Sequence, residues 1–229
     1  KVGRNGGACN ECGAILYLVD ALGLDEVFFD NGRENALNAV MSVSERLCLI
    51  ATIELMRSVN PARLSRTLVV ADGPMAAIGA IERLTGPMLN YLDAVAEELV
   101  DSGYDPMLVV GVEKGGNFAT HGHQIAEAVP RGHAMMLTTD YIARNITGRP
   151  GGRDYGVRQM YGRRFFYRRK RDGAVLTLTV PARAGLTPYG QAQGVNETWD
   201  AYPTLRTVIE VLEGLTDSRL HGAVLPLTY

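Results

Sequence analysis

Hydrophobic and polar positions along the chain predict both helices and strands. Residues 35–59 and 84–102 are long stretches rich in Leu, Met, Ala and Glu, which is typical of helices. The first is expected to end at Asn60-Pro61, because a residue before proline disfavours the helical conformation, and the second to end before Gly103. Residues 123–129 predict a short helix and residues 204–215 a C-terminal one.

Three continuous apolar runs, at residues 68–71, 107–112 and 134–139, predict buried strands. Because they alternate with helices, we expect an α/β fold whose sheet is at least partly parallel and covered on both faces. Further along, RRFFYRRK and AVLTLTV flank Asp172-Gly173, a dipeptide that suits a tight turn. This segment predicts a β-hairpin.

Composition narrows the class of protein. The chain has 229 residues, of which 46% are hydrophobic and 21% charged, so it can bury a substantial core. Its net charge of -2 gives no global attraction for nucleic acid, so a polyanion site would need a local basic cluster. No window approaches the roughly 18 to 20 apolar residues of a membrane helix, and we expect a soluble protein. Three cysteines, an odd number, favour a reducing cytoplasm over a disulfide framework.

Charged residues follow each of the three predicted strands. They are Asp72, then Glu113 and Lys114, and finally Asp140. If the strands are parallel, these groups lie along one edge, where open α/β sheets bind ligands. Neighbouring carboxylates need a cation, and hard oxygen ligands suit Mn²⁺ or Mg²⁺. For each aspartate alone, a turn or a helix cap is the alternative role.

The first long helix offers a third carboxylate, from Glu45 or Glu54. These residues are nine positions apart and therefore lie on opposite faces of the helix. The neighbours of Glu45 on its own face are mostly apolar, so we expect Glu45 to face the sheet. Glu54 stays open as the alternative ligand, and a salt bridge with an arginine is the alternative role for Glu45.

Two further clusters are candidate binding sites. Residues 163–171 contain three aromatic and six basic side chains, a mixture that suits a nucleic-acid backbone and stacked bases, and the basic ones are Arg163, Arg164, Arg168, Arg169, Lys170 and Arg171. A solvated edge strand is the alternative for them. Cys9 and Cys12 form a C-x-x-C pair, which supplies two of the four ligands of a structural Zn²⁺ site. A glycine-rich turn is the alternative there.

Several motifs, taken in order, resemble the NurA nuclease family, particularly its bacterial branch. They are DGP at residues 72–74, VGVEKGG at 110–116, TTDYIARNI at 138–146, the YGRRFFYRRK strand and the late helix before LHGAVLPLTY. The resemblance covers residues 9–229. It implies a ribonuclease H-like mixed sheet flanked by helices with an added basic β-hairpin, and a Mn²⁺-dependent or Mg²⁺-dependent DNA nuclease. It also implies a homodimer that works with a hexameric HerA-type ATPase translocase in DNA repair or antiphage defence.

The resemblance assigns roles to individual residues. Asp72 matches the acid of the family's Asp-Gly-Ser-Leu-like motif, with Pro74 in place of serine. Asp140 matches the later acid that opens a helix, and Lys114 matches a basic residue after the middle strand. Glu45 corresponds to the helix glutamate of the bacterial pattern and Glu54 to that of the archaeal one. The expected catalytic set is therefore Asp72, Asp140, Glu45 and Lys114, with the three carboxylates holding the metal.

Two family motifs have no counterpart in the chain. The first is an amino-terminal Asp-Gly-Ser, and the second is a closing histidine that would follow Tyr229. We therefore expect a Gly/Cys-rich segment at residues 1–34 and a nuclease domain at residues 35–229 that is truncated at both ends. The alternative is a catalytically degenerate DNA-binding or scaffolding subunit of the same fold. A nucleotide-binding protein is disfavoured, because neither of the usual glycine-rich phosphate motifs is present.

Overall fold

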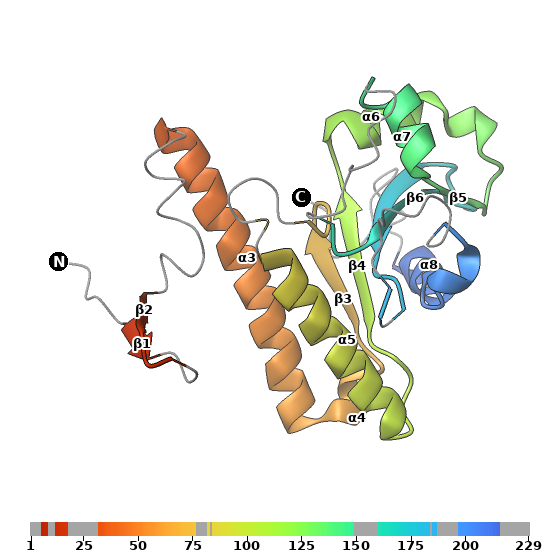
Figure 1. Ribbon diagram of the computed structural model, residues 1–229. Helices are drawn as coiled ribbons and strands as arrows, with labels where there is room; N and C mark the ends of the chain where they lie inside the picture. The colour runs from red at the N-terminus through yellow and green to blue at the C-terminus, as the bar shows by residue number, and fades with distance from the viewer. Residues whose placement is uncertain are drawn as a thin grey trace.

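The computed structural model describes residues 6–8, 12–17, 32–76, 82, 84–148, 160–183, 185–186 and 197–215. Figure 1 shows their arrangement. In chain order the elements are β1 (Gly6–Ala8), β2 (Ile15–Tyr17), α3 (Gly32–Val59), α4 (Pro61–Leu64), β3 (Leu68–Asp72), α5 (Thr85–Asp101), β4 (Leu108–Glu113), α6 (Gly116–Gln124), η2 (Ala126–Ala128), β5 (Ala134–Met136), α7 (Thr139–Asn145), β6 (Arg163–Arg168), β7 (Val175–Val180), η3 (Trp199–Ala201) and α8 (Leu205–Gly214).

The central feature is a five-stranded mixed sheet with the strand order β3-β4-β7-β6-β5. β3 and β4 are parallel, and all the other neighbouring pairs are antiparallel. The predicted mixed α/β fold is confirmed at this level. The predicted hairpin also forms, as β6 and β7, but it lies between β4 and β5 and is not an addition at the edge. β1 and β2 form a separate two-stranded antiparallel sheet.

Strand direction corrects the expectation of one shared carboxyl edge. Each step from β4 to β7, from β7 to β6 and from β6 to β5 reverses the direction of the chain. β5 is consequently antiparallel to β3 and β4, and it ends at the opposite end of the sheet from them. The apolar runs predicted the presence of the three strands, the third of which is shorter than expected, but they contain no information on which neighbour each strand pairs with.

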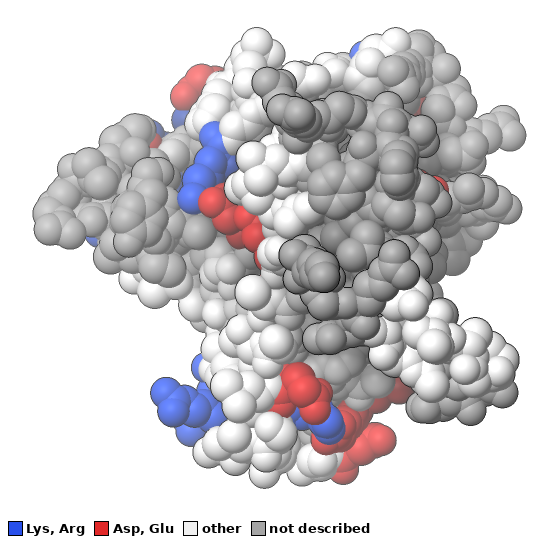
Figure 2. All heavy atoms as spheres, turned by 90° about the vertical axis from the view of Figure 1, so that its left-hand side faces the viewer, with Lys and Arg blue, Asp and Glu red and all other residues white. Residues whose placement is uncertain are grey.

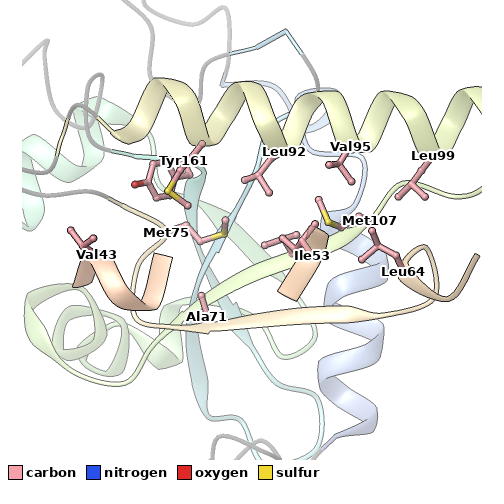
Figure 3. Close-up of a cluster of buried hydrophobic side chains, with 12 residues drawn as sticks. Val43, Ile53, Leu64, Ala71, Met75, Leu92, Val95, Leu99, Met107 and Tyr161 are labelled. Carbon is pink, nitrogen blue, oxygen red and sulfur yellow. The ribbon is translucent and has the colours of Figure 1, made fainter. Parts of the chain in front are cut away.

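Helices cover both faces of the sheet. On one face, α3 and α5 pack over β3 and β4 around a cluster that includes Ile53, Leu92 and Val109. In Figure 3, Leu92, Val95 and Leu99 point from α5 into this cluster. The same face carries a second cluster beside α6 and α7, and α8 covers the opposite face. Among the described helices, none is both long and apolar enough to cross a membrane.

Helix limits match the sequence where apolar periodicity is strong. The helices predicted at residues 35–59, 84–102 and 204–215 are α3, α5 and α8. The helix predicted at residues 123–129 is misplaced, since α6 spans Gly116–Gln124 and only the short 3-10 helix η2 follows it. The glycines of α6 resemble helix breakers, which concealed its start. Gly122 lies in a closely packed place, since a Cβ there would lie 3.1 Å from the Phe166 side chain. α7 replaces the end of the predicted third strand, because the Thr138 side chain caps it through Tyr141 N–H.

The segment after β3 crosses over the middle of β4. Gly73 N–H donates to Val112 O over 2.9 Å, and Tyr161 N–H donates to Met75 O over 2.7 Å. Gly73 has a φ of +87°, a conformation that glycine adopts without strain. A Cβ on Gly111 would lie 2.6 Å from Gly73 O. Gly111 is therefore the residue that allows this close crossing.

We expect Gly111→Ala to destabilise the fold by about 1–3 kcal/mol, because the added methyl group meets backbone atoms that cannot rotate away. Chemical denaturation monitored by circular dichroism measures this change. The matched control is Gly86→Ala in the first turn of α5, where a Cβ meets nothing within 4 Å. Equal stability of the two variants would contradict the close crossing.

Candidate functional site

Asp72 and Lys114 meet at the carboxyl ends of the two parallel strands. Asp72 is the last residue of β3 and pairs in register with Val112, two residues before Lys114. The Lys114 Nζ atom lies 3.0 Å from Asp72 Oδ2, and the two side chains are 37% and 65% exposed. The predicted proximity of these two residues is confirmed, and both remain accessible to a ligand.

Backbone groups beside this pair favour an anion. Gly115 is the N-cap of α6 and makes no side-chain capping bond, and Gly116 has a φ of +84°. The first turn of a helix presents N–H groups without intrahelical partners and a partial positive charge. Lys114 and the start of α6 thus form a positively polarised end of the sheet next to the carboxylate of Asp72.

Asp140 lies elsewhere. It is in the first turn of α7, where a carboxylate is favoured by the helix dipole, and it forms an i,i+4 ion pair with Arg144 at 2.8 Å. Since β3 and β5 are the two edges of the sheet, four strand spacings separate them, or about 19 Å. The expectation that Asp72 and Asp140 emerge at one edge is therefore wrong.

Glu45 is exposed on α3. Among the α3 side chains whose burial is described, from residue 37 onwards, the buried ones are Val43, Arg46 and Ile53, so the face towards the sheet is the one opposite Met41 and Cys48, which are exposed. The expectation that Glu45 faces the sheet is wrong. Met41 and Cys48 beside it belong to an exposed surface of the helix, while Leu49 packs at the edge of the core.

Arg46 is the α3 residue that reaches the segment after Asp72. Its side chain is buried, and its Nη2 and Nε atoms donate to Pro74 O over 2.9 Å and to Ala76 O over 3.3 Å. The sequence did carry a signal for this contact. An arginine between Val43 and Ile50 at helical spacing interrupts an apolar stripe, and such a residue needs buried acceptors. Arg46 holds the exit from β3 in place.

Glu54, the alternative helix ligand, belongs to a link between α3 and α5. Its carboxylate lies 2.7 Å from Arg57 Nη2, and Tyr91 OH donates to it over 2.8 Å. Arg57 also binds Glu98 at 2.7 Å. The hydrogen bond from Arg57, with that from Tyr91, lowers the pKa of Glu54 to about 2. Burial, and then Glu54 itself, raise the pKa of Tyr91 to about 12.

The arginines of the hairpin are buried, with Arg163, Arg164, Arg168 and Arg169 at 7% exposure or less. A carboxylate pairs with each guanidinium, and in three of the four pairs it comes from outside the hairpin. The pairs are Arg163–Glu197, Arg164–Glu113, Arg168–Glu127 and Arg169–Asp172. The alternative of a solvated edge strand does not fit, since β6 lies between β7 and β5. The expected DNA-binding surface does not fit these four side chains either, because they are buried. The basic run is part of the interior of the sheet.

Lys170 and Arg171 are the exposed basic residues of the segment. They lie in the turn between β6 and β7. Because β6 has the same direction as β4, this turn extends from the same end of the sheet as Asp72 and Lys114. The expectation of a basic surface near the strand ends therefore remains for these two residues.

Described residues do not form a complete metal site. Within the described ranges, no group of three or more His, Cys, Asp or Glu side chains could hold a metal ion. Cys12 is an exposed free thiol, and Cys9 lies outside the described residues, so the C-x-x-C site stays a prediction.

A pocket of about 290 Å³ lies at the other end of the sheet. Its lining is mainly apolar and includes Leu92 from α5, Met107 before β4 and Pro181 after β7. Asp93 also lines it. Burial raises the pKa of Asp93, while a hydrogen bond from Gly185 N–H lowers it. The pocket is thus separate from the Asp72–Lys114 pair, which we take as the candidate site because it combines accessible charges with a helix start.

Comparisons of the chain with family models, with curated proteins and with solved structures give no match.

The buried ion pair Arg164–Glu113 and the exposed ion pair Lys114–Asp72 are expected to contribute differently to the stability of the fold. We expect Glu113→Gln to destabilise the fold by about 3–5 kcal/mol, because the Arg164 guanidinium stays buried and loses its carboxylate. Asp72→Asn removes an exposed ion pair and is expected to cost about 1 kcal/mol or less. Urea denaturation measures the free energy of unfolding of the two variants. A larger loss of stability for Asp72→Asn than for Glu113→Gln would contradict the assignment of Arg164–Glu113 as the buried pair.

Glu54 is expected to make stability depend on pH. Its folded pKa of about 2 lies below its ordinary value of 4.5, so its stabilising effect is full above pH 4.5 and is lost as the pH falls towards 2. The difference in melting temperature between the native chain and Glu54→Gln should shrink over that window. Glu45→Gln makes the same chemical change on the exposed face of α3 and serves as the control. A melting-temperature difference for Glu54→Gln that does not change with pH would contradict the contacts of Glu54 with Arg57 and Tyr91.

Proposed function

We propose that this protein is a metal-dependent DNA nuclease subunit that acts with a hexameric HerA-type ATPase translocase. One observation carries the proposal: an accessible carboxylate, Asp72, and an ammonium group, Lys114, lie side by side at the carboxyl ends of parallel strands. Open α/β sheets bind their ligands at this location. The ordered motifs that resemble the NurA family add the substrate class and the partner to this proposal.

The surroundings of the pair suit a phosphodiester. Lys114 and the N–H groups at the start of α6 would meet the phosphate, since both favour negative charge. Lys170 and Arg171, exposed at the same end of the sheet, would contact the DNA backbone further along. A strand of DNA would then run from the hairpin turn towards Asp72.

The described residues fit a divalent ion only in part. Sites that bind Mg²⁺ or Mn²⁺ with a substrate phosphate commonly use one or two carboxylates, with water and phosphate as further ligands. Asp72 would be one such carboxylate, and neither Asp140 nor Glu45 is oriented to join it. An ion bound there would supply Lewis-acid charge for phosphodiester hydrolysis. The remaining protein ligands would come from outside the described residues.

The finer fold assignment is part of the same proposal. The family resemblance implies a ribonuclease H-like core and a homodimer. The five-stranded mixed sheet with helices on both faces is compatible with such a core.

A second candidate function is a catalytically degenerate subunit that binds DNA or supports the translocase. The strand order favours it, because Asp72 and Asp140 lie at opposite edges of the sheet. In such a subunit, the hairpin turn and Lys114 would still bind a DNA backbone.

Cleavage of linear DNA with Mn²⁺ tests the first function. We expect Asp72→Ala to lower the rate at least about 100-fold and Lys114→Ala to lower it by a similar factor, because each removes a charge placed at the reacting phosphate. Asp105→Ala, an exposed aspartate that follows the end of α5, is the control and should leave the rate unchanged.

Two outcomes decide between the candidates. Cleavage that Asp72→Ala leaves intact refutes the site. DNA binding without any cleavage, weakened by Lys170→Ala with Arg171→Ala and by added salt, supports the degenerate subunit.

A further inference from the structure

The apolar pocket at the far end of the sheet has the properties of a small-molecule site. It has a volume of about 290 Å³, is partly open to solvent and lies between α5, the start of β4 and the segments that follow β7 and precede α8. Its lining includes the buried core residues Leu92, Met107 and Val109. Sites for small ligands are typically concave, mainly apolar pockets of about this volume or larger.

Proline residues stiffen the wall of the pocket. Pro106, Pro181 and Pro203 line it from three separate segments of the chain. Because proline fixes φ, these segments have fewer conformations into which they can collapse. Proline also has no N–H group, so it leaves no amide donor without a partner in an apolar space. We therefore expect the pocket to be formed before a ligand binds.

The charged groups of the lining are mainly acidic. Asp93, Glu97 and Asp101 line the pocket from α5 at intervals of four residues, so one stripe of the helix presents all three. Among the described lining residues, the only Lys or Arg is Arg183. Within the described part of the chain, none of the three carboxylates forms an ion pair with Lys or Arg. The lining therefore carries a net negative charge.

The end of α5 adds to this negative potential. The C-terminal end of a helix carries a partial negative charge that favours cations, yet the last turn of α5 contains no basic residue. Asp101 is the last residue of the helix, where the helix dipole disfavours a carboxylate. Figure 2 shows a group of acidic side chains at the lower end of the molecule, which is the end at which α5 finishes in Figure 1. A positively charged ligand would offset this potential.

Asp93 is the acid best placed to meet a ligand in the pocket. Its side chain is half-buried, and its Oδ2 atom accepts a hydrogen bond from Gly185 N–H over 3.0 Å. Burial raises the pKa of Asp93, the hydrogen bond lowers it, and the nearby Glu97 raises it. The ionised carboxylate is thus partly desolvated and lies near a second carboxylate. A cation bound beside both would relieve this unfavourable situation.

We propose that this pocket binds a small organic cation, with its apolar part against the core residues and its ammonium group between Asp93 and Glu97. A neutral apolar molecule would leave the two carboxylates without a counter-ion, and an anion would be repelled by them. The pocket lies at the opposite end of the sheet from Asp72. The proposal therefore does not depend on the nuclease activity.

Three probes of similar shape test the charge of the ligand. They are 2-phenylethylamine, which is a cation at neutral pH, the neutral 2-phenylethanol and the anion 3-phenylpropanoate. We expect the amine to bind the whole chain with a dissociation constant of roughly 1 mM or lower. The alcohol and the anion should bind at least about 10-fold more weakly, because neither can donate a charge-assisted hydrogen bond to a carboxylate. Ligand-observed NMR titration measures all three.

Two pairs of variants test whether the amine binds in the pocket. Asp93→Asn keeps the shape and removes a charge, so it should weaken binding at least about 10-fold. Asp105→Asn changes an exposed acid outside the lining and should leave binding unchanged. Ala96→Leu adds bulk to the lining and should abolish binding, whereas Ala94→Leu makes the same change at an exposed position of α5 and should not.

Three results overturn the proposal. The first is no binding of the amine up to about 10 mM. The second is binding of the alcohol or the anion that is as tight as that of the amine. The third is binding of the amine that Asp93→Asn leaves unchanged. Thermal melting of each variant shows whether it is folded, and Asp93→Asn decides the question if Ala96→Leu does not fold.

Discussion

Arg164 and Glu113 form an ion pair in the middle of the sheet, where both side chains are almost fully buried. They reach each other across β7, so the pair holds β4 and β6 in a fixed relation on either side of that strand. The Arg164 guanidinium also lies 3.9 Å from the centre of the Phe118 ring, which connects the pair to α6. Breaking such a pair leaves an uncompensated charge in the interior, so the register of these three strands depends on it.

The other buried arginines extend this constraint to the rest of the fold. Arg163 donates to Leu137 O, Tyr202 OH and Glu197, and Glu197 also accepts from Thr139 at the start of α7. Arg168 binds Val129 O and Glu127 beyond α6. A buried charge must find partners, and here the partners come from segments before and after the hairpin in the sequence. The hairpin was expected as an addition to the sheet, but its strands lie inside the sheet and its arginines connect the surrounding segments.

The candidate site is placed by the same architecture. The parallel pair β3 and β4 brings Asp72 beside Lys114, and Arg46 together with Gly111 holds the segment that leaves β3 over the sheet. Insertion of the hairpin between β4 and β5 separates Asp140 from them. On α3, the buried Arg46 faces the sheet, and this leaves Glu45 exposed on the other side of the helix. The position of the site therefore follows from the strand order and from the face that α3 buries.

By itself, the sequence determined the local elements of this protein. Apolar periodicity predicted α3, α5 and α8, continuous apolar runs predicted β3 and β4, and Asp172-Gly173 predicted the turn of the hairpin, because backbone preference and burial act over a few residues. It also predicted that Asp72 and Lys114 would be neighbours, since adjacent parallel strands end together. Only the tertiary structure decided the position of the hairpin, the direction of β5 and the burial of four arginines. These features depend on pairing between distant segments, and a basic strand has the same sequence whether its partners are carboxylates inside the protein or phosphates outside it.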